Sequence, residues 1–225
     1  MARDFDAVSL DVGGVLVVPD HGVLAQVLDD HGITYDRSAF GAGHYAAMAA
    51  VDRAMSDAED FTDYLLGFVD AIGVPTGAQH LAHDELAAVL RTPVWCQPVP
   101  GARLGVAALA SVGLRLAVTS NSDGRVADVL RRHEWLQVGD GPGVQAVVVT
   151  DSGHVGYAKP DARMFQVTAD ALDLAPERIL HVGDSVHYDV EGATAAGMQA
   201  VHLDPFGLCR STEHRHAAAL VELLG

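Results

Sequence analysis

Five side chains suited to acid, base or nucleophilic chemistry stand at or just after the predicted ends of strands: Asp11, Ser120, Lys159, Asp184 and Asp189. Three carboxylates that crowd together repel one another, so they need a cation, and hard oxygen ligands suit Mg²⁺. A bound Mg²⁺ and the Lys159 ammonium would neutralise a phosphoryl group, while Ser120 would hydrogen-bond its oxygens. Asp11 could then attack phosphorus as a nucleophile and form an aspartyl-phosphate.

Two further features of the sequence bear on this mechanism, the residue after Ser120 and the number of lysines. Asn121 follows Ser120, and a backbone N–H at this point could bind the same phosphoryl oxygens. Lys159 is the single lysine of the 225-residue chain, which has 13 arginines. Any mechanism that needs two lysines is therefore excluded.

Alternating strands and helices are predicted to position these residues. Strands are expected over residues 5–11, 114–121, 144–150, 178–185 and 198–204, and helices over 101–113, 123–136, 160–174, 189–197 and 211–224. This alternation is typical of an α/β fold with a Rossmann-like, doubly wound parallel sheet. Ligands of such sheets bind beyond the carboxyl ends of the strands, so the five side chains should converge on one crevice.

Helix caps are predicted at two of these boundaries. Asp161 is placed to cap the helix that follows it, and Ser122 or Asp123 should cap the helix over 123–136.

Residues 20–91 have a different pattern, in which apolar residues recur at helical spacing. About four helices are expected, over 21–32, 36–55, 57–73 and 78–91. We therefore predict two domains, an α/β core of residues 1–18 and 98–225 and a helical cap of residues 19–97.

Two histidines of the predicted cap are candidate substrate-binding residues. They are His21, which follows the first strand, and His44, which lies in a predicted helix. A histidine at position 21 could also supply a proton to a leaving group. The histidines near the fourth motif are interpreted differently: His181 as filler of a buried strand and His187 as a rim residue.

The joint pattern resembles the haloacid dehalogenase (HAD) superfamily of phosphatases. The matching segments are SLDVGGVLV around Asp11, AVTSNS around Ser120, YAKPD around Lys159, and HVGDSVHYDVEGA, which contains Asp184 and Asp189. The resemblance implies that Asp11 is both nucleophile and Mg²⁺ ligand, and that Ser120 and Lys159 hold phosphate.

The same resemblance implies the rest of the metal site. Asp184 and the backbone carbonyl of Gly13 would bind Mg²⁺, with Asp189 as a ligand or in the second shell. The helical insert resembles the cap of one large subgroup, which closes over the site and selects the substrate.

Gly13 departs from the family pattern, because most HAD phosphatases have a second Asp two residues after the nucleophile. That Asp protonates the leaving group and later activates water, and such acid–base catalysis contributes about 10²–10⁴-fold, or roughly 3–5 kcal/mol. We favour a phosphatase that has a good leaving group or takes its proton from the cap or from water.

Three other functions are alternatives to this one. A 2-haloacid dehalogenase also lacks the second Asp but needs no metal, so the intact GDSVHYD segment argues against it. A phosphonatase needs a cap lysine, and residues 20–91 contain none. The last alternative is a non-catalytic phosphate-binding protein that has kept the fold.

Composition limits the partners and the location. The net charge of −16 argues against nucleic acid and anionic membranes as partners. No apolar run reaches about 18 residues, and two distant cysteines without metal-ligand spacing indicate reduced thiols. We expect a cytoplasmic protein that acts on a small phosphorylated metabolite. The sequence leaves the substrate and the oligomeric state open and permits a homodimer.

Overall fold

The computed structural model of the chain describes residues 4–55 and 61–225, which form two compact units. An α/β unit comprises Met1–Leu16, Pro100–Pro205 and Ser211–Gly225, and a helical unit comprises Val17–Val99 and Phe206–Arg210. The sequence prediction had placed residues 206–210 in the α/β core. They group with the helices, where the rings of Phe206 and Tyr45 pack with centroids 5.5 Å apart.

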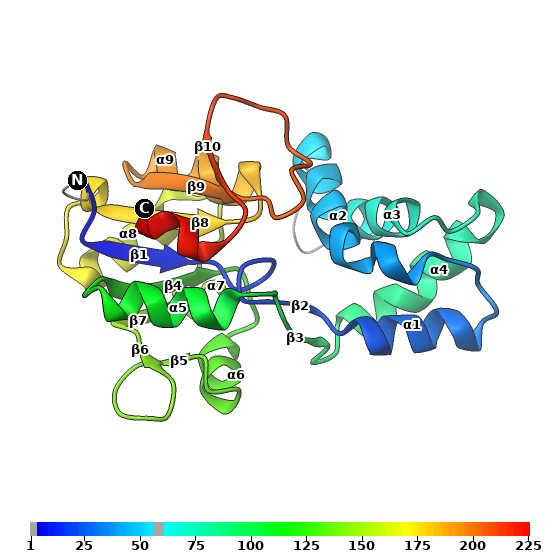
Figure 1. The fold of residues 1–225 in the computed structure, drawn as a ribbon, viewed down its shortest axis with the longest axis horizontal. Coiled ribbons are helices and arrows are strands. Elements are labelled where there is room, and N and C mark those ends of the chain that lie inside the picture. Colours follow the sequence, from blue (N-terminus) through cyan, green and yellow to red (C-terminus); the bar gives the residue numbers. More distant parts are fainter. Residues whose placement is uncertain (1–3, 56–60) are drawn as a thin grey trace. The chain divides into compact units, whose positions relative to one another are not determined.

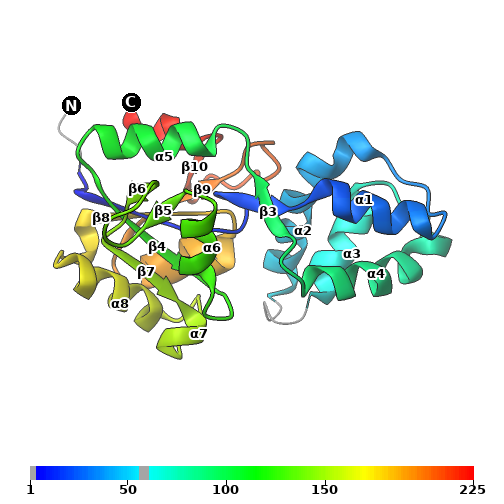
Figure 2. The ribbon, with the colours of Figure 1, turned by 90° about the horizontal axis from the view of Figure 1, so that it is seen from below.

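A six-stranded parallel sheet forms the centre of the α/β unit (Figure 1). Its order is β10 (Arg215–Ala217), β9 (Gln199–Leu203), β8 (Ile179–Gly183), β1 (Ala7–Leu10), β4 (Arg115–Ser120) and β7 (Val148–Asp151). Helix α5 (Ala102–Ser111) covers one face and α8 (Ala162–Leu172) the other (Figure 2). Every residue of β1 and β8 is buried, as expected for central strands with both faces covered. The predicted doubly wound sheet is confirmed.

The remaining elements of this unit are short. They are α6 (Val126–Arg132), β5 (Leu136–Gln137), β6 (Val144–Gln145), α7 (Ser152–Val155), the 3-10 helix Pro176–Arg178, the π-helix Val186–Glu191, α9 (Gly192–Ala195) and the 3-10 helix Leu220–Leu224. The core under α8 contains Phe165 and Leu172 packed with Ile179 and Met198.

One of the two predicted helix caps is confirmed. The Asp161 carboxylate accepts a hydrogen bond from the Arg163 N–H at the start of α8. At α6, in contrast, the cap comes from Asp151, whose Oδ2 accepts from the Val126 N–H at 3.1 Å. Neither predicted cap residue, Ser122 or Asp123, caps α6, so that prediction was wrong. The Ser122 hydroxyl lies 3.5 Å from the Asp123 carboxylate, which accepts from the side chain and the backbone N–H of Arg125 just before the helix.

The final helix predicted over 211–224 was also wrong. Residues 215–217 form β10, which lies along β9 with His216 opposite His202, and a short 3-10 helix follows. Hydrogen bonds along the edge of an existing sheet outweigh the intrinsic helix preference of an alanine- and leucine-rich segment.

The helical unit contains the four predicted helices, α1 (His21–Asp30), α2 (Phe40–Ala54), α3 (Thr62–Ala71) and α4 (Thr76–Leu90). Part of the third prediction, residues 57–60, lies outside the described residues. A 3-10 turn (Arg37–Ala39) precedes α2, and the strands β2 (Val17–Pro19) and β3 (Trp95–Pro98) pair antiparallel within this unit. Among residues 4–55 and 61–225, no helix is sufficiently long and apolar to cross a lipid bilayer.

Close packing of α2 on α3 depends on a glycine. A Cβ atom at Gly67 would lie 2.7 Å from the Ala50 Cβ and 3.0 Å from the Ala47 Cα, and the latter is backbone that cannot move away cheaply. At Gly77 in α4 an added Cβ would meet nothing within 4 Å. The two glycines therefore form a matched pair for testing this packing.

We predict that Gly67→Ala destabilises the protein by about 1–3 kcal/mol, because overpacking outweighs the gain in helix propensity. Gly77→Ala should instead be neutral or stabilise by up to about 1 kcal/mol. Urea unfolding followed by circular dichroism measures both changes. Equal effects of the two substitutions would show that the α2–α3 contact does not require the glycine.

Candidate active site

The carboxyl ends of three adjacent strands carry the predicted catalytic residues. Asp11 follows β1, Ser120 is the last residue of β4, and Asp184 follows β8. β1 lies between β4 and β8, and the Asp11 N–H continues the ladder by donating to the Val182 carbonyl at 2.9 Å. Strand order and register therefore bring these three residues to one edge of the sheet.

The chain turns sharply directly after Asp11. Gly14 adopts the left-handed conformation with φ 65°, and the Leu16 N–H closes the turn on the Val12 carbonyl at 2.9 Å. Of the two adjacent glycines, Gly14 is the one with positive φ, which side chains rarely adopt. Gly13 is half-buried at the start of this turn.

Three buried carboxylates could hold a divalent cation. Asp11, Asp184 and Asp189 each offer an oxygen, and these three atoms lie within 4.8 Å of one another. Ligands about 2.0–2.1 Å from an octahedral Mg²⁺ are separated by roughly 3–4 Å, so small movements would close this donor set around the ion. The residues present fit Mg²⁺ in number, charge and type.

Asp189 is held in place by its surroundings. It belongs to the π-helix Val186–Glu191, and its Oδ2 accepts from the Ser185 N–H at 3.1 Å. A Cβ atom at Gly183 would lie 2.0 Å from the Asp189 Cγ, so the carboxylate packs directly against glycine backbone. Local backbone geometry thereby fixes the carboxylate beside the strand end.

Lys159 joins two of the carboxylates. Its Nζ lies 2.9 Å from the Asp11 Oδ1 and 2.6 Å from the Asp189 Oδ1, and its side chain is 3% exposed. The Asn121 side chain holds the lysine backbone from both sides: Oδ1 accepts from the Lys159 N–H at 2.8 Å, and Nδ2 donates to the Lys159 carbonyl at 3.0 Å. The side-chain amide of Asn121 thus positions the lysine. The predicted contact with phosphate involves a different group, a backbone N–H near Asn121, and it stays a prediction.

Burial and the three neighbouring charges set the electrostatics. Burial raises the pKa of Asp11 to about 6, with Lys159 opposing the shift and the charges of Asp189 and Asp184 adding to it. Burial also opposes charge on Asp189, but Lys159 and His181 outweigh it and hold the pKa of this carboxyl well below its usual range. The pKa of Lys159 is raised, since Asp11 and Asp189 outweigh its desolvation. The three carboxylates carry more negative charge than the single buried ammonium can neutralise, and this excess favours binding of a cation.

His181 has a role that the sequence analysis missed when it was interpreted as strand filler. Its Nε2 lies 3.0 Å from the Asp189 Oδ1, and its Nδ1 lies 3.1 Å from the Ser9 Oγ. The buried chain continues from Ser9 to the Thr119 Oγ1 at 2.8 Å and on to the Thr168 Oγ1 at 2.7 Å. The signal available in the sequence was the polar residue among apolar neighbours in two buried strands, Ser9 in AVSL and His181 in ILHVG.

The histidines predicted to bind substrate lie in the helical unit. The His21 Nδ1 accepts a hydrogen bond from the Gln97 Nε2 at 3.0 Å, and burial lowers the pKa of His21. His44 is buried, with its Nδ1 2.9 Å from the Tyr64 hydroxyl. Substrate binding by His21 and His44 stays a prediction. His187, predicted at the rim, is half-buried and lies beside Glu191.

Comparisons with known proteins match the chain to one family of hydrolases. Residues 5–197 match the profile of haloacid dehalogenase-like hydrolases. The chain is 37% identical over 135 residues to phosphoserine phosphatase of Thermus thermophilus. The matched segment is 60% of this chain and 50% of that protein. The chain spans about half the length of the first curated relatives it matches.

Solved structures share the fold. A HAD-hydrolase from Bacillus subtilis bound to magnesium has a TM-score of 0.62 at 16% identity, covering 98% of this chain and 97% of that one. A dehalogenase has a TM-score of 0.59 at 17% identity, covering 99% of this chain and 97% of that one.

The buried lysine generates a test of the site's electrostatics. We predict that Lys159→Met costs about 3–5 kcal/mol of unfolding free energy in chelator, because two buried carboxylates lose their counter-charge. Mg²⁺ should recover part of this loss by supplying positive charge to the same carboxylates. Denaturant unfolding with and without Mg²⁺ measures both effects.

The control for this test is Arg125→Met, which removes a cation from an exposed pair with Asp123 and should change stability little under either condition. A Lys159→Met loss that Mg²⁺ leaves untouched would contradict a cation site among the three carboxylates.

Proposed function

Because this chain belongs to the haloacid dehalogenase-like hydrolase family, we propose that it is a Mg²⁺-dependent phosphatase acting on a small phosphomonoester. One observation carries the proposal: the buried Asp11 carboxylate lies 2.9 Å from a buried ammonium and beside two further carboxylates at the carboxyl edge of the sheet. Relatives named phosphoserine phosphatase and glyceraldehyde 3-phosphate phosphatase support a small phosphorylated substrate. A cytoplasmic location, a homodimer and the role of the helical unit as a cap remain predictions from the sequence.

The metal would be held by Asp11, Asp184 and the backbone carbonyl of Gly13. When bound, Mg²⁺ supplies charge neutralisation and alignment of the phosphoryl oxygens. Both oxygens of Asp189 already accept hydrogen bonds, Oδ1 from Lys159 and Oδ2 from the Ser185 N–H. This geometry favours the second-shell alternative for Asp189, in which it holds Lys159 against the phosphoryl group.

The proposed reaction has two displacements at phosphorus. An Asp11 oxygen attacks, the bond from phosphorus to the leaving oxygen breaks, and the acyl phosphate forms on Asp11. Lys159 and Ser120 stabilise the charge that develops on the transferring oxygens, with Asn121 keeping the lysine backbone in position. Water then attacks the aspartyl-phosphate, releasing inorganic phosphate and restoring the carboxylate.

Gly13 removes the usual source of the proton for the leaving group. The proposal therefore assigns this enzyme a substrate whose leaving oxygen carries negative charge well, or a proton from His21 or from water. The cluster of three buried carboxylates argues against the dehalogenase alternative, which has no use for a cation. A phosphate-binding protein without turnover is the remaining alternative, and the nucleophile test separates it from the phosphatase.

We expect phosphate release from a panel of sugar, acyl and aryl phosphates to require Mg²⁺ and to fall by at least about 10³-fold in Asp11→Asn, because an amide cannot form the acyl phosphate. Asp128→Asn, which changes an exposed acid of α6, should leave the rate unchanged. A parallel assay measures halide release from 2-haloacids.

Three outcomes would contradict the phosphatase proposal. They are full turnover in excess chelator, an Asp11→Asn variant (checked for deamidation) with a near wild-type kcat, and halide release without phosphate release.

We expect log kcat/KM to fall steeply as the leaving-group pKa rises, because no acid stands at position 13. Gly13→Asp should raise turnover of alkyl phosphates by up to about 10²-fold, whereas Gly13→Asn, of similar size but without a proton to give, should not. If His21 supplies the proton, His21→Ala should selectively slow substrates with poor leaving groups. A flat slope in both wild type and His21→Ala would refute a deficiency in leaving-group protonation.

A further inference from the structure

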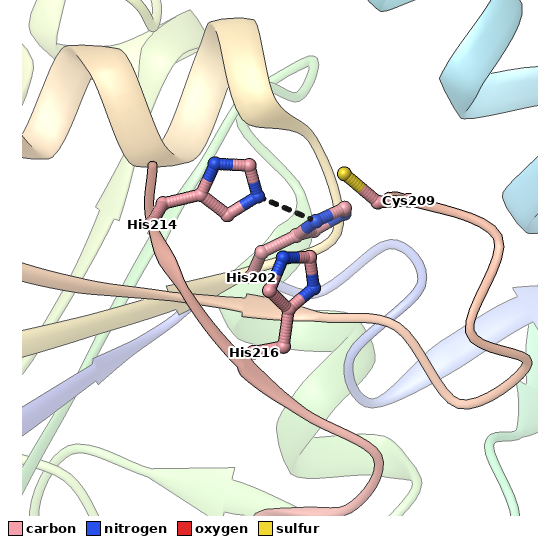
Figure 3. Close-up of side chains that lie close together, drawn as sticks. All are labelled: His202, Cys209, His214 and His216. Atoms are coloured by element: carbon pink, nitrogen blue, oxygen red, sulfur yellow. Dashed lines mark hydrogen bonds between the residues drawn. The ribbon is translucent and has the colours of Figure 1, made fainter. Parts of the chain in front are cut away.

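Three histidines gather on the sheet edge farthest from the strands that carry Asp11 and Ser120 (Figure 3). His202 on β9 and His216 on β10 are direct partners in the parallel register. His214 lies just before β10, and its ring centroid is 4.5 Å from that of His216. The ring centroids are 4.5 to 5.3 Å apart.

The nitrogen atoms are spaced as metal ligands require. Each histidine offers a ring nitrogen within 4.8 Å of those of the other two. The His214 Nε2 lies 3.3 Å from the His202 Nδ1. Two nitrogens about 2.0–2.1 Å from a tetrahedral zinc ion would be separated by roughly 3.3 Å, so this pair already has the required spacing.

Backbone carbonyls orient two of the rings. The His202 Nε2 lies 3.1 Å from the Asp184 carbonyl, and the His216 Nε2 lies 3.1 Å from the Ser211 carbonyl. Carbonyl oxygens only accept hydrogen bonds, so both Nε2 atoms carry a hydrogen and both Nδ1 atoms present a lone pair. Histidines that ligate metals commonly donate their other N–H to a carbonyl in this way.

We propose that His202, His214 and His216 form a zinc site separate from the carboxylate site. Neutral imidazoles favour Zn²⁺ over Mg²⁺, which prefers oxygen ligands. The ion would replace the hydrogen bond between His214 and His202, and His214 would then carry its proton on Nδ1. Cys209, also drawn in Figure 3, belongs to segment 206–210 of the helical unit, and the proposal rests on the three histidines alone.

Zinc at this position would tie the edge strand β10 to β9. β10 is only three residues long, so a metal bridge between strands would add a strong restraint to a short ladder. His202 also contacts the backbone carbonyl of Asp184, and the bridge would therefore also restrain the chain directly after β8. The expected consequence is higher stability of the metal-loaded protein.

The test uses untagged, full-length, chelator-stripped protein in excess Mg²⁺, which keeps the carboxylate site occupied. Calorimetric titration with Zn²⁺ should give one ion per chain with a micromolar or lower Kd. The double variant His214→Ala/His216→Ala should bind at least about 100-fold more weakly, since it lacks two of three ligands. His133→Ala, which removes an exposed histidine of the same unit, should bind as wild type does. Co²⁺ in place of Zn²⁺ should give the intense visible absorption of a four-coordinate site.

No zinc uptake by the wild type, or equal uptake by the double variant, would overturn the proposal. If the double variant does not fold, the exposed residue is replaced alone as His216→Ala. Zinc should then raise the Tm of the wild type more than that of this variant, because a ligand that binds more tightly stabilises the folded state more at the same concentration. Equal Tm shifts would also overturn it.

Discussion

The ion pairs of Lys159 with Asp11 and Asp189 are the interaction on which the site depends. Burying charges is costly unless each is paired and hydrogen-bonded. Here one ammonium bridges two carboxylates at 2.9 and 2.6 Å, and Asp184 adds a third acid beside them. The carboxylates outnumber the ammonium, so the proposed divalent cation, or the rearrangement of charge that accompanies a bound phosphoryl group, would balance the cluster. This excess of negative charge favours the proposed ligands.

The parallel sheet holds the neighbouring carboxylates close together despite their mutual repulsion. β1 is hydrogen-bonded on both sides, to β4 and to β8, so the strand ends cannot drift apart to relieve repulsion. Beneath them, His181 contacts Asp189 and Ser9 and so links the charged edge to a buried chain of hydroxyls. Each polar group of this chain has a partner within the core, which is the condition under which polar groups are tolerated there.

The proposed phosphatase reaction has two tasks, attack on phosphorus and protonation of the leaving group, and Gly13 affects the second. In the proposed reaction, binding and nucleophilic attack rest on the carboxylates, Lys159 and Ser120, all of which are in the α/β unit. Protonation of the leaving group has no acid at position 13 and must come from the substrate's own chemistry, from water or from a group such as His21. The positive φ of Gly14 rather than of Gly13 means that the turn itself does not demand glycine at position 13.

From the sequence alone we could predict the alternation of strands and helices, the parallel sheet and the candidate set Asp11, Ser120, Lys159, Asp184 and Asp189. These features can be predicted because the spacing of apolar residues and the positions of strand ends are local properties of the chain. Tertiary structure alone decided which side chains serve as supports: the Asn121 amide that holds Lys159, the Asp151 carboxylate that caps α6, and the His181 link to Asp189. It also made residues 215–217 a strand, because the free edge of β9 supplies hydrogen bonds that no local pattern reveals. Such contacts join residues far apart in the chain, and only the folded sheet brings them within reach.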